Sequence, residues 1–337
     1  MNRFDYVRPS TVAEAVQALG SDPAARFIAG GTNLIDLMKY DVERPGKLID
    51  ITRLPLDKIE ERDGGLRIGA LVTNAALAYD ARIRERYPLL ADAILAGASA
   101  QLRNAASTGG NLLQRTRCYY FYDTATPCNK REPGTGCSAI GGVDRIHAIL
   151  GTSEHCIATH PSDMCVALAA LEATVRVSGP QGDRVIPFAE FHRLPGDDPA
   201  KDTNLAPGEI IVSVDLPARG FAGHHTYLKL RDRLSYAFAL VSVAAALELD
   251  GQTIRTARLA LGGVAHKPWR NTDAEALLQG RPATRESFKA AADLVLREAK
   301  PQSTNGFKIE LARRAIVRGL EQAAAGTPQS QSDKRIQ

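Results

Sequence analysis

Four of the five cysteines in this sequence of 337 residues lie within one stretch that is punctuated by glycine and proline. They are separated by 9, 8 and 18 residues, at Cys118, Cys128, Cys137 and Cys156. These spacers match neither the C-x2-C pairs of zinc ribbons nor the run of closely spaced cysteines in ferredoxins, so spacing alone does not select the metal. Four thiolates are nevertheless the ligand set of a cubane iron–sulfur cluster, whose negative charge nearby cations would favour. The stretch supplies such cations at Arg115, Arg117, Lys130, Arg131 and Arg145.

Two other interpretations of the cysteine stretch remain open. One is a zinc site in which His147, His155 or His160 replaces a thiolate. The other is a solvated basic loop that contains unrelated thiols. Most of the stretch has neither helical nor strand periodicity, and an ordered loop of that length is usually functional or stapled, which favours a metal site. The fifth cysteine, Cys165, shares a helical face with apolar residues and is predicted to be a small core residue.

Two glycine pairs form a second candidate site. They lie in AGGTNLI (29–35) and TGGNLLQ (108–114), and each pair precedes an asparagine and a leucine. Glycine lets backbone amides approach a phosphate closely, so each segment is a candidate half of a phosphate cradle. Neither matches G-x-G-x-x-G or the P-loop, so Rossmann and Walker chemistry are not indicated. The alternative is two ordinary tight turns.

The composition predicts a globular protein of two domains, or of one domain with subdomains, with 44% hydrophobic and 24% charged residues. The net charge of +4 is spread along the chain without a block of like charges, so we expect no nucleic-acid partner. No run of 18 apolar residues occurs and the N-terminus lacks the features of a signal peptide, so we expect no membrane insertion. The expected compartment is the cytoplasm, or the periplasm if a signal-bearing partner subunit carries the chain out.

Apolar periodicity predicts alternating strands and helices that position these groups. Helices are expected near 12–19 after an N-cap at Thr11, 34–39, 74–100 with a break at Pro88, 163–171, 272–279, 284–297 and 307–325. Strands are expected near 25–28, 47–52, 65–73, 174–179, 208–217, 226–231, 240–249 and 253–262. A turn at 63–65 is expected to join the strands at 47–52 and 65–73, and the second glycine pair is expected to follow a short strand or turn.

Five segments in this order resemble the FAD-binding middle subunit of molybdenum hydroxylases, the xanthine dehydrogenase and carbon monoxide dehydrogenase group. They are FIAGGTNLIDLMK, ASTGGNLLQ, THPSDMCVALAALEATV, GEIIVSVDLP and YLKLRDRLSYAFALVSVA. The resemblance covers about 4–325. Most members lack the cysteine loop. It resembles the insertion in FAD subunits of 4-hydroxybenzoyl-CoA reductases and, more closely, of bacterial periplasmic aldehyde oxidoreductases, both of which hold a [4Fe-4S] cluster there.

The resemblance implies an α+β fold. A PCMH-like FAD-binding domain of two subdomains is expected over 1–222, with the cysteine loop at about 115–158. A smaller C-terminal α/β domain of the CO dehydrogenase flavoprotein type is expected over 223–326. The polar residues 327–337 are expected to form a disordered tail.

The resemblance also implies residues that bind FAD. The pyrophosphate would lie between a first segment, Ile28, Ala29, Gly30, Gly31, Thr32, Asn33 and Leu34, and a second segment, Thr108, Gly109, Gly110 and Asn111. Asp163 would bond a ribityl or ribose hydroxyl, Ile211 would contact the isoalloxazine, and Lys229 would lie near the flavin ring. The alternatives are a helix cap, a core strand residue and a surface charge. The aromatic run 119–122 is expected either to line the flavin or the cluster, or to pack the loop.

The function implied is that of an FAD- and [4Fe-4S]-containing electron-transfer subunit in a molybdenum-dependent aldehyde oxidoreductase. Substrate would be oxidised on a molybdenum-cofactor subunit, and a [2Fe-2S] subunit would complete a heterotrimer that delivers electrons to an external acceptor. No catalytic residue for substrate is expected on this chain. The alternatives are the FAD subunit of an enzyme like 4-hydroxybenzoyl-CoA reductase, and a zinc-stapled binding protein without flavin.

Overall fold

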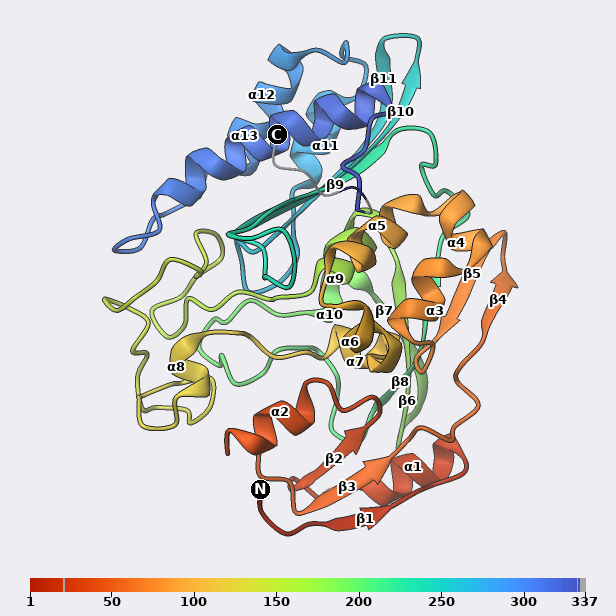
Figure 1. Ribbon diagram of the computed structural model, residues 1–337, viewed down its shortest axis with the longest axis vertical. Helices are drawn as coiled ribbons and strands as arrows, with labels where there is room; N and C mark the ends of the chain where they lie inside the picture. The colour runs from red at the N-terminus through yellow and green to blue at the C-terminus, as the bar shows by residue number, and fades with distance from the viewer. Residues whose placement is uncertain (21, 332, 334–337) are drawn as a thin grey trace.

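Three separate sheets organise the molecule. The computed structural model describes residues 1–20, 22–331 and 333. The N-terminal sheet lies at one end, a larger sheet with its helices occupies the middle, and the C-terminal sheet and its helices lie at the other end (Figure 1). The expected mixture of helices and sheets is confirmed.

The N-terminal sheet is parallel, in the order β1-β3-β2. Its strands are β1 (Asp5–Val7), β2 (Ala25–Ile28) and β3 (Lys47–Asp50), and its helices are α1 (Val12–Leu19) and α2 (Leu34–Lys39). The predicted cap of α1 is confirmed, because the Thr11 side chain accepts a hydrogen bond from Glu14 N at 3.1 Å. The first glycine pair lies between β2 and α2, so the sheet presents it at the carboxyl end of a strand.

The central sheet is antiparallel, in the order β4-β5-β8-β6-β7. Its strands are β4 (Ile59–Arg62), β5 (Gly65–Gly69), β6 (Thr174–Gly179), β7 (Gly182–Pro187) and β8 (Ile210–Leu216). The predicted turn at 63–65 joins β4 to β5, whereas β3 lies in the N-terminal sheet, so the expected pairing of 47–52 with 65–73 is wrong. The sequence of β4, IEER, is mostly charged and exposed, which hides its strand character.

Short helices cover the central sheet. They are α3 (Asn74–Tyr79), α4 (Ala81–Arg86), α5 (Pro88–Ala96), α6 (Ala100–Ala105), α7 (Thr108–Leu112), α9 (Asp163–Ala170) and α10 (Phe188–Phe191). The region 74–100 breaks at Asp80 as well as at Pro88, because the Asp80 carboxylate caps α4 at Arg82 N, 2.9 Å away. The second glycine pair lies inside α7 rather than in a turn, because the Ser107 hydroxyl caps this helix at Gly110 N.

The cysteine loop contains little regular secondary structure, as its aperiodic sequence predicts. Between 115 and 158 the only helix described is α8 (Tyr119–Tyr122), a single turn. The loop lies to one side of the molecule beside α2 (Figure 1). Its own small core contains three buried cysteines and Phe121, and Leu37 of α2 packs against them.

The C-terminal sheet is antiparallel, in the order β12-β11-β10-β9. Its strands are β9 (His225–Leu230), β10 (Val241–Asp250), β11 (Thr253–Gly262) and β12 (Trp269–Arg270), and its helices are α11 (Thr272–Leu278), α12 (Arg285–Val295) and α13 (Phe307–Ala325). Helix α13 packs against β9 and β10; of the central layer, α5 contacts the same two strands and α9 contacts β10 and β11. Tyr227 therefore belongs to the core of the central layer.

The C-terminal tail contacts the edge strand β9. Gln329 Oε1 accepts a hydrogen bond from Lys229 N at 2.9 Å, and Gln331 Nε2 donates to Tyr227 O at 3.2 Å. Of the tail expected over 327–337, residues 332 and 334–337 lie outside the described residues. Among the helices that the structure describes, none is both long enough and apolar enough to cross a bilayer.

Candidate functional site

The first glycine pair forms one wall of a large cleft. Gly31 has φ +70°, a left-handed conformation that favours glycine. A Cβ on Gly30 would lie 1.8 Å from the carbonyl oxygen of Ala105, at the end of α6. The first glycine segment and the segment that leads into the second pair are therefore in direct backbone contact, and their approach requires Gly30.

The second glycine pair forms the facing wall. A Cβ on Gly109 would lie 3.1 Å from the Ala70 side chain, and one on Gly110 would lie 2.9 Å from the Ser107 hydroxyl. The Asn111 side chain is held from both ends: its Nδ2 donates to Asn74 Oδ1 at 2.8 Å, and its Oδ1 accepts from Ser162 at 2.5 Å. The two glycines are therefore tightly packed on one side. Because they carry no side chain, their backbone atoms line the cleft on the other side.

The cleft has a volume of about 1400 Å³ and collects almost every residue that the family resemblance assigned to FAD. Those that line it are Ile28, Ala29, Gly30, Gly31, Thr32, Asn33, Leu34, Gly109, Gly110, Asn111, Asp163, Ile211 and Lys229. Thr108 does not line it, because its buried hydroxyl donates to Val72 O at 2.9 Å. Segments far apart in the sequence thus converge on one elongated space, which exceeds the usual size of small-ligand pockets.

A buried ion pair lies at the wall of the cleft. Lys229 Nζ donates to Asp163 Oδ2 at 2.7 Å, and the Lys229 side chain is only 2% exposed, so it is not a surface charge. Tyr227 donates to Asp163 Oδ1 at 2.7 Å, and burial raises the pKa of Tyr227 well above its usual value. Ser162, not Asp163, caps α9. Asp163 and Lys229 therefore form a compensated charge pair behind the cleft.

Polar atoms without a partner mark the cleft as a place for a ligand. In the part of the chain that the structure describes, Asn33 Nδ2 and both ring nitrogens of His160 are buried without a hydrogen-bond partner, and both residues line the cleft. Buried donors of this kind are normally satisfied. A ligand with phosphate, hydroxyl and ring acceptors, such as a dinucleotide, fits these free groups and the glycine-lined walls.

The four loop cysteines line a separate small cavity. Cys128 and Cys137 lie opposite each other in an isolated antiparallel bridge, and Cys156 Sγ accepts from Ala158 N at 3.4 Å. Burial raises the pKa of Cys118 to about 12 and that of Cys156 to about 11, so these thiols would lose their protons only on binding a metal. The tertiary fold therefore brings together the set that the sequence indicated, and Cys165 lies in the core instead.

The loop thiols lie around one cavity without forming a tight group of three. Within the described residues, the only trio of histidine, cysteine or acidic ligand atoms within 4.8 Å of one another is His160, Cys165 and His192. The four loop cysteines share the lining of the small cavity instead.

Two of the three histidines of the zinc alternative lie at the cysteine cavity, and the third lies in the cleft. His160 lines the cleft and lies 4.4 Å, between ring centroids, from His192. His155 borders the cysteine cavity, and His147 Nε2 lies 3.1 Å from Cys118 Sγ. Of the aromatic run, Tyr120 and Phe121 border the cysteine cavity, whereas Tyr119 lines the cleft.

Of the five predicted cations, Lys130 borders the cysteine cavity. Arg131 donates to the carbonyl oxygens of Tyr120 and Phe121 and so supports the loop backbone. Arg145 pairs with Asp232 at 2.7 Å. Arg115 and Arg117 line the cleft.

Sequence reasoning missed three groups at these sites: Asp202, His266 and Tyr227. Asp202 pairs with Lys130, from which it is separated by 72 positions, and Tyr227 bonds Asp163 across 64 positions. These partners meet only through the tertiary fold. One indication for Tyr227 is present in the sequence, because it lies in the predicted strand that also holds Lys229.

Comparison with protein families agrees with this geometry. Residues 2–219 match the model of the FAD binding domain in molybdopterin dehydrogenase, and residues 225–323 match that of the CO dehydrogenase flavoprotein C-terminal domain. The chain belongs to the FAD-binding medium subunits of the molybdenum hydroxylases. Membership makes the interpretation as a binding protein without flavin wrong, and it makes this medium subunit part of an oxidoreductase.

Curated relatives of this medium subunit cover nearly its whole length. It is 53% identical over 327 residues to the aldehyde oxidoreductase FAD-binding subunit PaoB of Escherichia coli (strain K12), covering 96% of this chain and 99% of that protein. It is 28% identical to the carbon monoxide dehydrogenase medium chain of Hydrogenophaga pseudoflava, covering 96% and 98%.

Solved structures share the fold. A carbon monoxide dehydrogenase from Hydrogenophaga pseudoflava has a chain that matches with a TM-score of 0.76 and 29% identity, covering 96% of this chain and 98% of that one. The quinoline 2-oxidoreductase of Pseudomonas putida 86 matches with a TM-score of 0.74 and 26% identity, covering 97% and 98%.

Proposed function

We propose that this medium subunit is the FAD- and [4Fe-4S]-containing electron-transfer subunit of a molybdenum-dependent aldehyde oxidoreductase. A molybdenum-cofactor subunit would oxidise the aldehyde, and a [2Fe-2S] subunit would pass the electrons to this chain. This chain would then transfer them to an external acceptor. The observation that carries the aldehyde assignment is the 53% identity to the Escherichia coli aldehyde oxidoreductase subunit over 96% of the chain. The medium-chain name of the carbon monoxide dehydrogenase relative supports a role within a larger assembly.

Bound FAD would supply one- and two-electron transfer, and a [4Fe-4S] cluster would supply one-electron transfer. The chain itself supplies binding and electrostatics. The two glycine segments would hold the pyrophosphate through backbone amides, with the free Asn33 Nδ2 as an added donor. The Asp163–Lys229 pair would present hydrogen-bonding groups to the flavin without an uncompensated charge.

The four loop cysteines would hold the cluster. Their convergence on one cavity supports this assignment, because four thiolates are the ligand set of a cubane cluster. Lys130, with its side chain 1% exposed, would offset part of the negative charge of the thiolates. Three of the four thiols are shielded from water, since Cys118, Cys128 and Cys156 are each at most 7% exposed, whereas Cys137 is partly exposed.

The first test is the absorbance spectrum of the purified protein with iron and zinc analysis. We expect the structured bands of flavin on a broad brown shoulder, with about four irons per chain and no stoichiometric zinc. Flavin bands with zinc and without iron would overturn the cluster assignment and leave the FAD assignment intact.

The second test separates electron transfer from substrate oxidation. The isolated chain mixed with aromatic or aliphatic aldehydes should keep its flavin bands, because no residue set for substrate chemistry is assigned here. The complex co-purified with its partner subunits should bleach. Bleaching of the isolated chain at a comparable rate would show that substrate is oxidised on this subunit and would overturn the proposal.

A further inference from the structure

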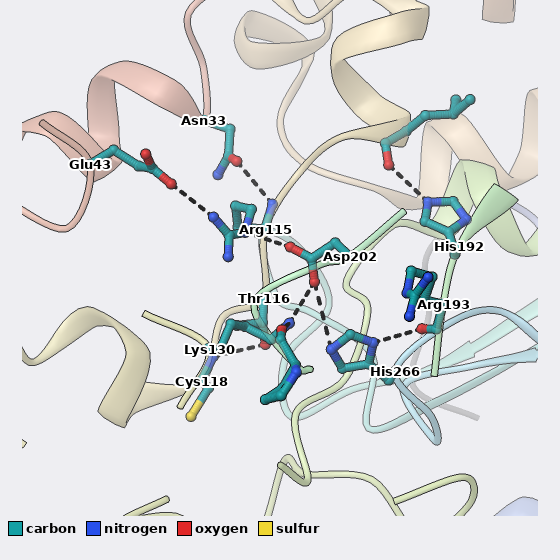
Figure 2. Close-up of polar contacts among 12 residues, drawn as sticks. Asn33, Glu43, Arg115, Thr116, Cys118, Lys130, His192, Arg193, Asp202 and His266 are labelled. Carbon is teal, nitrogen blue, oxygen red and sulfur yellow. Dashed lines mark hydrogen bonds and ion pairs between the residues drawn. The ribbon is translucent and has the colours of Figure 1, made fainter. Parts of the chain in front are cut away.

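Asp202 lies between the cysteine cavity and the cleft. It belongs to the segment 192–209 that connects α10 to β8. Its carboxylate forms ion pairs with Lys130 Nζ and with Arg115 Nε, both at 2.5 Å, and lies 3.6 Å from His266 Nε2. Figure 2 shows the three side chains approaching this carboxylate from different parts of the chain.

The two cations belong to different sites. Lys130 comes two residues after Cys128 and borders the cysteine cavity. Its ammonium group has a second acceptor in the same connecting segment, Pro199 O at 2.8 Å. The segment that carries Asp202 therefore holds Lys130 at two points.

Arg115 belongs to the cleft. Its Nη1 donates to Glu43 Oε1 at 2.8 Å, and its backbone N donates to Asn33 Oδ1 at 3.0 Å. Asn33 belongs to the first glycine segment, and Arg115, Glu43 and Asn33 all line the cleft. Figure 2 shows the resulting line of contacts from Asn33 and Glu43, through Arg115 and Asp202, to Lys130.

The negative charge of Asp202 and the positive charges of Lys130 and Arg115 stabilise one another. Burial opposes ionisation of Asp202, but the charges of Lys130 and Arg115 outweigh it and hold the pKa of this carboxyl well below its usual range. Burial lowers the pKa of His266 to about 4, so this ring is neutral at neutral pH. Without the Asp202 charge, Lys130 would keep a carbonyl but lose its counter-ion in a buried position, which is costly.

We propose that Asp202 is a positioning residue that couples the two cofactor sites, because one carboxylate fixes both Lys130 in the cysteine cavity and Arg115 beside the cleft. A change of charge at either site then alters the field and the geometry at the other through a contiguous set of ion pairs in a medium of low dielectric. This inference rests on the proposed function, in which the cleft holds FAD and the cavity holds the cluster.

The test starts with Asp202→Asn, which removes the charge and keeps the shape. Measured on the protein as purified, both iron content and FAD affinity should fall, the latter by about twofold to tenfold, and the midpoint potential of the flavin should shift. Asp202→Glu should restore both. The matched control is Asp198→Asn, in the same segment, whose carboxylate pairs only at the surface with Lys201 at 2.9 Å. Loss at one site alone, or at neither, would overturn the coupling.

Two further variants test the coupling between the two sites if Asp202→Asn does not fold. Lys130→Met, in the cysteine cavity, should weaken FAD binding, and Arg115→Met, in the cleft, should lower iron content. Unchanged FAD affinity in the first and unchanged iron in the second would refute the proposal. A wild-type protein without iron would defeat the cluster assignment instead, and the effect of Lys130→Met on FAD affinity would still test the coupling.

Discussion

The cleft and the cysteine cavity are built in opposite ways. The cleft is assembled from segments in three parts of the fold, from Ile28 at the end of β2 to Lys229 in β9, and regular secondary structure surrounds it. The cavity is formed by one contiguous loop whose only helix is a single turn. The cleft exists because the sheets and helices around it are stable. The loop has no ladder of its own, so we expect a bound metal to supply much of its order.

The largest expected effect tests that dependence. Cys128→Ser or Cys137→Ser should lose nearly all cluster iron and loosen the loop, because a lost thiolate removes a ligand on which the loop depends. FAD should be at least partly retained, because the cleft is built from other segments. Iron analysis, the flavin spectrum and limited proteolysis of the loop measure the three outcomes.

The control for this pair is Cys165→Ser, since Cys165 is fully buried in the core of the central layer. It should keep its iron. If Cys165→Ser strips the iron while Cys156→Ser keeps it, the ligand set is wrong.

The next effect lies in the cleft. Lys229→Met should destabilise the protein by about 3–5 kcal/mol, because it leaves the Asp163 carboxylate buried and without its cation. FAD affinity should fall with it, whereas the cysteine cavity should keep its iron. Urea unfolding and FAD titration measure the two effects.

Lys289→Met, on the exposed side of α12, is the matched control and should change neither quantity. Wild-type stability in Lys229→Met would mean that the Asp163–Lys229 pair is not the charge compensation described above.

Substitutions in the glycine pairs test whether the cleft binds FAD through its backbone. Gly110→Ala should fold, because its Cβ meets only the Ser107 side chain, and should weaken FAD binding by about tenfold, equivalent to roughly 1.4 kcal/mol. Gly30→Val should lose FAD and stability together, because its Cβ would collide with the backbone at Ala105. Flavin occupancy and thermal unfolding distinguish the two.

Gly223→Ala serves as the control for both, since nothing lies within 4 Å of its added Cβ. Full flavin occupancy in Gly110→Ala and Gly30→Val would remove these segments from the site.

The last effect is a pH dependence. Burial lowers the pKa of His192 and of His266 to about 4, whereas both return to about 6.5 in the unfolded chain. Between these values the unfolded chain binds more protons, so the free energy of unfolding should fall as pH falls from about 6.5 to 4, by up to about 1.4 kcal/mol per unit for each histidine.

Denaturant unfolding at several pH values measures this slope. His192→Gln should reduce it by one histidine's share, and His155→Gln, at a half-exposed ring, should not. An identical slope in the wild type and in His192→Gln would contradict the assignment.

The predictable parts of the molecule are those that local sequence determines. Helix α1 follows from its Thr11 cap and apolar face, and the cysteines were recognised as a set because an aperiodic loop of that length needs a staple. Nearly all of the residues that the family resemblance assigned to FAD line one cleft. The prediction of a turn at the second glycine pair failed because the Ser107 hydroxyl caps α7, and the pair lies inside that helix.

The unpredictable parts depend on partners distant in sequence. Asp202 follows a lysine in an irregular segment, and no local pattern indicates that its partners are Lys130, Arg115 and His266. The same holds for Tyr227, whose position in a strand is evident but whose bond to Asp163 is not. Burial turns these ordinary residues into charge-compensating groups, and burial is a property of the whole fold.

The contact between the C-terminal tail and β9 has a consequence for assembly. An edge strand exposes unpaired main-chain groups to which another chain can add a strand. Here Lys229 N and Tyr227 O, on the free side of β9, are already bonded to Gln329 and Gln331. A neighbouring chain that extended this sheet would first have to displace Gln329 and Gln331. These tail residues therefore oppose edge-to-edge association at the strand that carries Lys229.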